Sequence, residues 1–286
     1  MSTYVIGDIH GCLTDWLLLK DKIEREDPKA TFILVGDIID RGLEIPQMLI
    51  WAMNNITENG KYQMIIGNHE HMKLTWFMLY NIRRDINNLP SDNYDFEITT
   101  IDKLCKNSED IDKIEDFIES LPFYKIKKIN GINFIITHSS FPSEFITSKG
   151  NILDKELNKV IKEYGYKAII RDKYKSHIIS DLIWTRNYAG NNFKNTIIVH
   201  GHSMTILDET INKKGVPGRI YYNRNDINVD CGCTFRRFGN PEANLAAIRL
   251  EDLKEFYTYE TKQLRKESLH SNYYREQMLN KINNKR

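Results

Sequence analysis

The feature that most constrains the fold is a pattern in which a short apolar run ends in polar side chains able to bind metals. The clearest example is TFILV at residues 31–35, which GDIIDRG at residues 36–42 follows directly. Continuous β-branched apolar runs of this length predict buried strands. Carboxylates beyond such a strand can ligate a hard cation, and a guanidinium can bind phosphate bidentately. Read alone, the segment also fits a polar turn in which Asp37 caps a helix and Arg41 pairs with Asp40.

The same pattern recurs four more times along the chain. Strand-like runs at residues 4–6, 63–66, 134–137 and 196–199 lead into GDIHG, GNHE, His138 and HGHS. In open α/β sheets, ligands bind beyond the carboxyl ends of strands. Five such strand ends therefore predict one shared site, although His138 alone would more often be a core histidine and Asn68 alone a turn residue.

The residue types at these strand ends are suited to a pair of metal ions. Asp8 and His10 are two residues apart on extended chain, so both side chains leave on one side. Carboxylate, imidazole and amide ligands without thiolate favour Mn, Fe or Zn. Two such ions about 3.5–4 Å apart can share a water and lower its pKa. One set would be Asp8, His10 and Asp37; the other would be Asn68, His138 and a histidine of the 200–202 pair, with Asp37 bridging.

Two other metal or nucleotide signatures are absent. The segment His69-Glu70-His71 does not continue to HExxH, because residue 73 is Lys73. The chain also lacks a GxxxxGK[ST] loop, which argues against a P-loop nucleotide site.

The periodicity predicts a parallel βαβαβ unit followed by a helical insertion. Strands are expected at 3–7, 31–35 and 62–66, with helices at 14–25, capped by Thr14, and 44–56. The insertion, about 71–120, has a helix over 71–86, a loop at 87–93 and helices over 101–120. It either shapes substrate choice or covers a sheet face. Asn130-Gly131 predicts a hairpin between 123–129 and 132–137. A helical region at 154–180, a strand at 196–199 and antiparallel strands at 219–222, 227–230, 244–250 and 254–259 follow.

Residues 1–260 are expected to form one domain, and the basic tail, 261–286, a solvated helix. The balance of 40 basic and 39 acidic residues gives no sign of a general nucleic-acid binder. The four cysteines form no CxxC pair and fit free thiols in a reducing cytoplasm, with Cys231-Gly232-Cys233 as a tight turn. No signal peptide and no apolar run of about 20 residues is found, so no membrane partner is expected.

Together, GDIHG, GDIIDRG, GNHE, His138 and GHS resemble the five motifs of calcineurin-like metallophosphoesterases, most of all bacterial and phage PPP-type serine/threonine protein phosphatases. The resemblance runs from Met1 to about Leu250. It implies an α/β (α+β) fold, a β-sandwich flanked by helices, here with a helical cap insertion. It also implies a dinuclear centre, with Mn expected and Fe or Zn as alternatives. The implied ligands are Asp8, His10 and Asp37 for one ion, and Asp37, Asn68, His138 and His202 for the other.

The resemblance also implies roles for residues that are not metal ligands. His69 would be the general acid that protonates the leaving alkoxide, with Asp40 orienting its ring. Arg41 and Arg186 would bind the phosphoryl oxygens, although a surface salt bridge fits Arg186 nearly as well. Related phosphodiesterases often carry GHxH, and the second histidine of that motif is replaced here by Met204.

The leading hypothesis is hydrolysis of phosphomonoesters, most of all phosphoserine and phosphothreonine in protein, by attack of a metal-bridging water on phosphorus. Symmetrical diadenosine tetraphosphate hydrolases are a close alternative, but they typically carry Ala at the place of Asp40 and Asp at that of Glu70. Broader phosphodiesterase activity or RNA-end processing is a third. A phosphate-binding scaffold without activity is disfavoured, because His69, Asp40 and Asp37 are all present.

Overall fold

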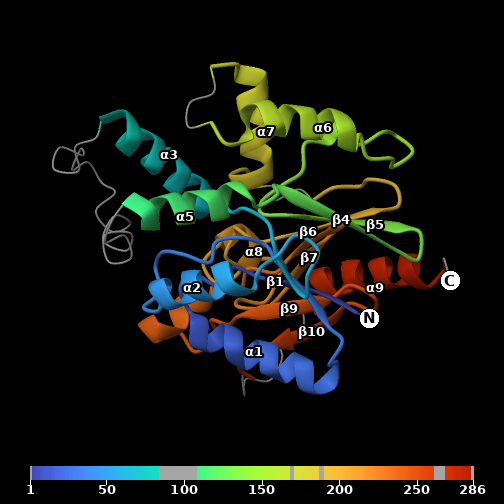
Figure 1. Ribbon diagram of the computed structural model, residues 1–286. Coiled ribbons are helices and arrows are strands. Elements are labelled where there is room, and N and C mark those ends of the chain that lie inside the picture. Colours follow the sequence, from blue (N-terminus) through green and yellow to red (C-terminus); the bar gives the residue numbers. More distant parts are fainter. Residues whose placement is uncertain (1, 84–107, 168–170, 187–189, 261–267, 285–286) are drawn as a thin grey trace.

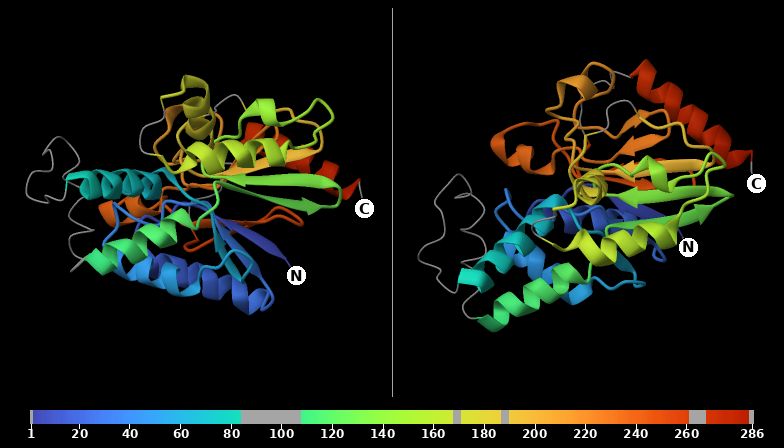
Figure 2. Two further views of the ribbon diagram at one scale, coloured as in Figure 1. Left: turned by 45° about the horizontal axis from the view of Figure 1, so that its top comes forward. Right: turned by 90° about the horizontal axis from the view of Figure 1, so that it is seen from above.

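Two five-stranded sheets pack face to face and carry helices on their outer faces (Figures 1 and 2). The computed structural model describes residues 2–83, 108–167, 171–186, 190–260 and 268–284. The predicted loop at 87–93 and residues 101–107 lie outside the described residues. The strand orders are β10-β9-β1-β2-β3 and β4-β5-β6-β8-β7. This arrangement confirms the expected helix-flanked β-sandwich.

The first sheet contains the predicted βαβαβ unit. Strands β1, β2 and β3 are parallel, and β9 and β10 extend the sheet in antiparallel fashion beside β1. Val5 and Ile33 point into the core between the sheets, whereas Tyr4 and Phe32 face the helices. The bounds are β1 Thr3–Ile6, α1 Leu13–Glu26, β2 Thr31–Leu34, α2 Ile45–Asn55, β3 Tyr62–Met64, β9 Ala246–Arg249 and β10 Lys254–Tyr257.

The second sheet begins with the predicted hairpin. Asn130 and Gly131 both have positive φ, 49° and 72°, as a two-residue type I′ turn requires. Strands β5, β6 and β8 are parallel, and β4 and β7 are antiparallel to their neighbours. The bounds are β4 Tyr124–Ile129, β5 Ile132–Thr137, β6 Thr196–His200, β7 Tyr221–Asn223 and β8 Asp226–Asn228.

Several helix boundaries differ from the expectation, and one difference bears on the site. Helix α3 begins at Asn68, not at 71, and is described to Arg83, so His69 and Glu70 belong to its first turn. The predicted Thr14 cap is wrong: α1 starts at Leu13, and Thr14 donates its backbone N–H and its hydroxyl to Glu44. The helices between α3 and α9 are α5 Ser108–Glu119, the 3₁₀ helix η2 Ser143–Phe145, α6 Asp154–Val160, a π-helical turn Ile161–Gly165, α7 Lys173–Ile183, α8 Glu209–Asn212 and the 3₁₀ helix η4 Cys233–Phe238.

Helix α9 (Leu269–Asn283) is part of the core, unlike the solvated helix expected for the tail. It packs along β7 (Figure 1) and buries Met278 and Ile282 among side chains of both sheets. Ser271 accepts the Tyr222 backbone N–H, and Arg275 donates to the Leu253 carbonyl. The helix therefore covers the open end of the sandwich beside β7.

Within the described part of the chain, no helix combines the length and the apolar character that crossing a membrane requires.

Candidate metal centre

The six predicted ligands come together where the strands end. They arrive from the ends of β1, β2, β5 and β6 and from the start of α3; all are buried except half-buried His202. Asp37 is central: its Oδ2 lies 3.6 Å from His10 Nε2 and 3.4 Å from His138 Nε2. Asn68 Oδ1 lies 2.8 Å from His138 Nε2 and 2.9 Å from His202 Nδ1. We refer to Asp8, His10, Asp37, Asn68, His138 and His202 as the strand-end cluster.

The backbone fixes the tautomer of all three histidines of this cluster. His10 and His138 use Nδ1 to donate to the carbonyls of Ile39 and Val35, both at 2.8 Å. His202 uses Nε2 in the same way toward Trp184, at 3.0 Å. The remaining ring nitrogen of each histidine faces a carboxylate or amide oxygen of the cluster, and His10 Nε2 also accepts from Arg41. This is how histidine ligands of metals are usually held.

Acceptors that face one another need a positive charge between them. Asn68 Oδ1 faces ring nitrogens of His138 and His202, and the Asp37 carboxylate faces those of His10 and His138. Two groups of side chains here are close enough to hold a metal ion each. One is His10, Asp37 and His69, and the other is Asp37, His138 and His202. The donor set therefore fits two cations that share Asp37.

The electrostatics of the cluster agree with this fit. Burial alone would raise the pKa of Asp37, but His138 and His69 outweigh it and hold that pKa well below its usual range. Burial would likewise lower the pKa of His138, yet the Asp37 carboxylate raises it to about 10. A cation would compete with the His138 proton for the same nitrogen.

Glu70 fixes the position of Asp37. Its carboxylate is fully buried and accepts the backbone N–H groups of Asp37, Ile38 and Gly67 at 2.8–3.0 Å. Asp37 itself has a positive φ of 50°, which costs energy in a residue other than glycine. A side chain at Gly67 would collide with Asp37 Oδ1. The start of α3 and the end of β2 thus hold each other in a strained but defined geometry.

His69 lies beside the cluster and is oriented by a carboxylate. Its Nδ1 is 2.7 Å from Asp40 Oδ2, and its Nε2 is 3.8 Å from Asp37 Oδ2. Lys73, one turn later on α3, is buried and pairs with Asp40 Oδ1 at 3.2 Å. Sequence reasoning gave Lys73 no role, although its place four residues after His69 puts both on one face of the helix.

Arg41 is an exposed guanidinium above the cluster. It donates to His10 Nε2 at 2.8 Å and to His69 Nε2 at 2.9 Å. A cation at His10 would take the same lone pair and would displace this hydrogen bond. Arg186 is also exposed, and its charge joins burial and His138 in lowering the pKa of His202 to about 3. Both predicted arginines therefore lie at the edge of the cluster.

Asp230, which the sequence analysis placed in a loop at the edge of the site without a catalytic role, lies beside the cluster. It is buried, its Oδ1 accepts the Gly232 N–H, and its Oδ2 has no hydrogen-bond partner among the described residues. After burial, the Asp230 charge is the main cause of the raised pKa of Asp8. Asp230 follows strand β8, so the strand-end pattern that identified the other residues also points to it.

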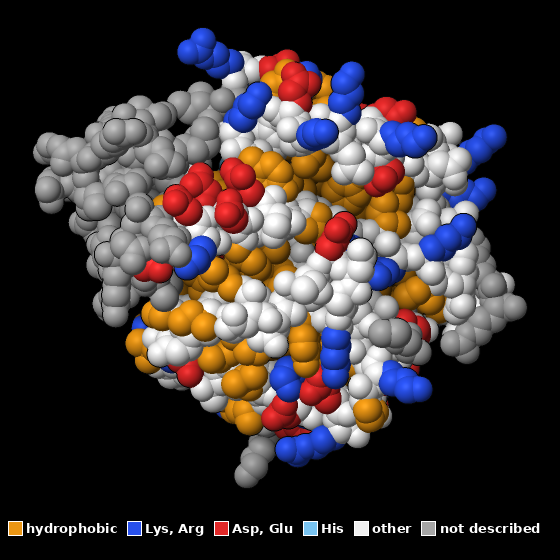
Figure 3. Space-filling model, viewed as in Figure 1, with side chains coloured by type: hydrophobic (Ala, Val, Ile, Leu, Met, Phe, Trp, Pro, Cys, Tyr) orange, Lys and Arg blue, Asp and Glu red, His pale blue; other side chains and the backbone are white. Residues whose placement is uncertain are grey.

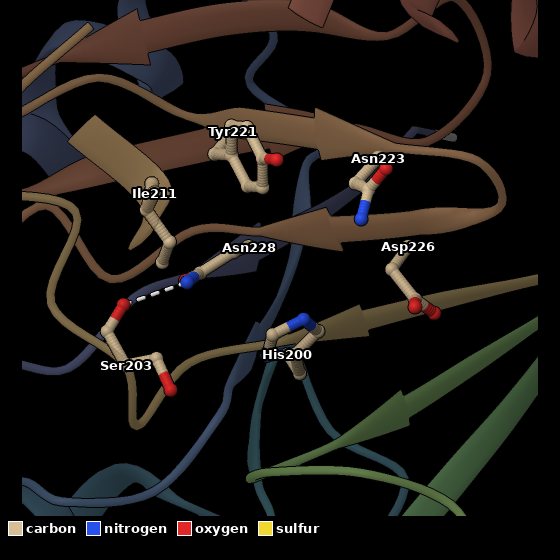
Figure 4. Close-up of a pocket in the computed structure, with 7 residues that line it drawn as sticks. All are labelled: His200, Ser203, Ile211, Tyr221, Asn223, Asp226 and Asn228. Carbon is tan, nitrogen blue, oxygen red and sulfur yellow. Dashed lines mark hydrogen bonds between the residues drawn. The ribbon is translucent and has the colours of Figure 1, made fainter. Parts of the chain in front are cut away.

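His200 faces away from the cluster, as expected from its place before the GHS motif. It lines a cavity of about 10 Å³ on the outer face of the second sheet (Figure 4), large enough for about one water molecule. We call this the sheet-face cavity; it is lined by His200, Ser203, Ile211, Tyr221, Asn223, Asp226 and Asn228.

The whole motif set matches one family model. Residues 1–229 match the family described as calcineurin-like phosphoesterase. The chain belongs to this family. Its members are phosphoesterases, and the family resemblance expected from the five motifs is therefore confirmed.

Relatives with assigned names come from the same family. Over 178 residues the chain is 24% identical to a symmetrical bis(5'-nucleosyl)-tetraphosphatase of Actinobacillus succinogenes, covering 62% of this chain and 58% of that protein. Over 275 residues it is 26% identical to an asymmetrical bis(5'-nucleosyl)-tetraphosphatase of Oceanobacillus iheyensis, covering 92% and 94%. The match to the first relative therefore spans less than two thirds of its length.

Solved structures share the fold. A cold-active protein-tyrosine phosphatase of a psychrophilic Shewanella species has a TM-score of 0.56 at 22% identity, covering 90% of this chain and 78% of that one. A protein serine/threonine phosphatase from Saccharomyces cerevisiae has a TM-score of 0.51 at 15% identity, covering 92% and 82%. At these identities the likeness extends to the fold alone.

Proposed function

We propose that this phosphoesterase hydrolyses phosphomonoesters of poor leaving groups, above all phosphoserine and phosphothreonine in protein. The observation that carries the proposal is the buried Asp40–His69 pair, 2.7 Å apart, beside the strand-end cluster. An alkoxide leaving group must be protonated as the P–O bond breaks, and an oriented imidazole is suited to that task. A nucleotide leaving group is already a stable anion and needs no such acid.

The strand-end cluster would hold the metals in this proposal. Asp8, His10 and Asp37 would ligate one ion, and Asp37, Asn68, His138 and His202 the other. Two bound ions would lower the pKa of a water between them and neutralise phosphoryl charge. The Mn expected from the sequence remains part of this proposal.

The other polar residues then act on the substrate. Arg41 and Arg186 would bind the phosphoryl oxygens and stabilise the charge that develops during transfer. Asp40 would hold His69 with Nε2 toward the leaving oxygen, and Lys73 would fix Asp40 through its ion pair. Glu70 would keep Asp37 in place through its three backbone hydrogen bonds.

The surface near these residues has apolar side chains that a peptide or a nucleobase could contact. Leu43 and Trp184 are both exposed. Leu43 is two residues from Arg41, and the Trp184 carbonyl accepts the His202 hydrogen bond. On the face shown in Figure 3, apolar side chains gather below α6 and α7 and over α2, acidic side chains cluster over α5, and Lys and Arg side chains lie mostly toward the edge.

A dinucleoside tetraphosphatase is the second candidate. The relative from Oceanobacillus iheyensis, which matches over 92% of this chain, carries that name. In this reading the two arginines would bind a polyphosphate and Asp40 would have no part in leaving-group departure.

The first experiment compares substrates with Mn present: a phosphothreonine peptide, diadenosine tetraphosphate and p-nitrophenyl phosphate at matched concentrations. Preference for the peptide supports the proposal. Preference for the dinucleotide favours the second candidate. If none of the three is hydrolysed, both are wrong.

The second experiment tests whether His69 is the general acid by comparing two substrates whose leaving groups differ in their need for protonation. His69→Asn is expected to lower kcat on the phosphothreonine peptide by roughly 10²–10⁴-fold, with a much smaller loss on p-nitrophenyl phosphate, whose leaving group needs little protonation. His71→Asn is the control, because His71 binds the Gly165 carbonyl outside the site. Equal losses on both substrates would contradict the role of His69 as the acid.

A further inference from the structure

A second group of candidate cation ligands lies next to the strand-end cluster and contains sulfur. Cys12 is the N-cap residue of α1, Asp15 lies in the first turn of that helix, and Cys233 begins η4. One ligand atom from each residue lies within 4.8 Å of the other two. Cys12 and Cys233 are buried, and Asp15 is half-buried.

The two thiols are in contact with each other. A hydrogen bond with Cys12, together with burial, raises the pKa of Cys233. Both cysteines are free thiols in the structure. Cys12 also donates to the His10 carbonyl at 3.6 Å.

Two sulfurs and a carboxylate are a ligand set for a thiophilic cation. Zn–S bonds near 2.3 Å and Zn–O bonds near 2.1 Å place tetrahedral ligands about 3.5–3.8 Å apart. The observed separations, all within 4.8 Å, need to close by at most about 1.3 Å.

The charges around the group balance once a divalent cation is present. Two thiolates and the Asp15 carboxylate carry three negative charges. Arg236 lies close enough to Asp15 to stabilise its charge, and it stacks on the Tyr259 ring at 3.8 Å. A divalent cation and Arg236 together supply three positive charges, so no net charge is buried.

We propose that Cys12, Cys233 and Asp15 bind a thiophilic divalent cation such as zinc. On binding, two S–H bonds break, two metal–sulfur bonds form, and two protons leave to solvent. The fourth position is left to water. This site is separate from the strand-end cluster and does not depend on the phosphoesterase reaction.

A cation here would connect two segments that carry residues of the catalytic site. Cys12 is two residues after His10, and Cys233 is three residues after Asp230. The bound ion would therefore link the β1–α1 segment to the segment that follows β8. It would be a structural ion next to the strand-end cluster and would take no part in phosphoester hydrolysis.

Cadmium titration tests the proposal, because cadmium–thiolate bonds give an ultraviolet charge-transfer band that histidine and carboxylate ligands do not give. The parent protein is C105S/C231S, which removes the other two cysteines. We expect the band to saturate at one thiolate-bound cadmium per chain in the reduced parent. Cys12→Ser or Cys233→Ser should abolish it, and Asp15→Asn should weaken affinity by at least the roughly 10–100-fold typical of losing an outer-shell partner.

Cys231→Ser alone is the matched control, since Cys231 is equally buried but outside the group. Its band should equal that of the wild type. A band that survives Cys12→Ser, a band lost in Cys231→Ser, or no band in the parent would overturn the proposal. A count of free thiols that is two short before reduction and complete after it would also overturn the proposal, because Cys12 and Cys233 would then form a disulfide in the resting protein. Circular dichroism checks folding of each variant, and Cys12→Ala or Cys233→Ala replaces a serine variant that misfolds.

Discussion

Two buried polar groups lie next to each other on β6 and β8, and only one of them has the geometry of a metal centre. His202 and Asp230 lie at the strand ends, whereas His200 and Asp226 line the sheet-face cavity. Both aspartates have a pKa that burial raises, to about 6 for Asp230 and about 7 for Asp226. Both also have an Oδ2 without a hydrogen-bond partner among the described residues. Burial and residue type therefore do not separate the two groups.

What separates them is how donors and acceptors are paired. In the sheet-face cavity, Asn228 donates to the Ser203 carbonyl, as Figure 4 shows, and Asn191 donates to Asp226. In the strand-end cluster, ring nitrogens whose protons point to the backbone face carboxylate and amide oxygens. Facing acceptors are the stronger sign of a cation site, and the comparison can be tested with pairs of matched variants.

The largest difference is expected between His202→Ala and His200→Ala. Removing His202 takes a ligand from the second ion, so the variant should hold fewer than two Mn ions per chain and lose most of its activity. His200→Ala should keep two ions, because His200 faces the cavity. Equilibrium dialysis with elemental analysis measures both. Two ions retained in both variants would show that His202 is not a ligand.

A smaller difference is expected between Asp230→Asn and Asp226→Asn. Asparagine keeps an oxygen for the Gly232 N–H but removes the negative charge beside Asp8. Asp230→Asn should therefore weaken Mn binding by roughly 10–100-fold, the usual scale for an outer-shell partner. Asp226→Asn should leave Mn affinity unchanged. Isothermal titration with Mn gives both values, and equal affinities would remove Asp230 from the metal centre.

The smallest expected effect is a change in folding stability with pH that arises from Asp226 in the sheet-face cavity. The folded pKa of Asp226, about 7, lies above its unfolded value near 3.9, so the folded protein holds this proton more tightly. Raising the pH from about 4 to 7 should therefore destabilise the wild type relative to Asp226→Asn. Hydrogen bonds from Asn191 and the charge of Arg224 lower the pKa of Asp226, but burial outweighs them. His200, with a pKa of about 4, is present in both proteins and titrates in both. Thermal unfolding across this range should show a Tm difference that grows with pH and then levels; a constant difference would contradict it.

The parts of the site that could be predicted from sequence are those whose information is local. The motifs around Asp8, Asp37 and His138 each contain a strand and the residue that ends it, and the parallel order of β1, β2 and β3 follows from short βαβ connections. The helix-flanked sandwich followed from the family resemblance.

The rest depends on contacts between distant segments. Glu70 acts by accepting N–H groups from the end of β2, and Asp230 by lying next to Asp8; no spacing in the sequence encodes either contact. Helix α9 was misread because Met278 and Ile282 are two apolar positions in a polar segment. Their burial depends on an edge of the sandwich that only the assembled sheets create.

The placement of β9 has a consequence for the order in which this protein matures. Strand β1, which leads into Asp8 and His10, is flanked by β2 on one side and by β9 on the other. During translation, β2 leaves the ribosome soon after β1, but β9 emerges only after every residue of the strand-end cluster has been made. Pairing over so long a separation is slow and closes late. The strand-end cluster is therefore synthesised before the strand that completes its sheet, and its geometry is expected to form in one late step.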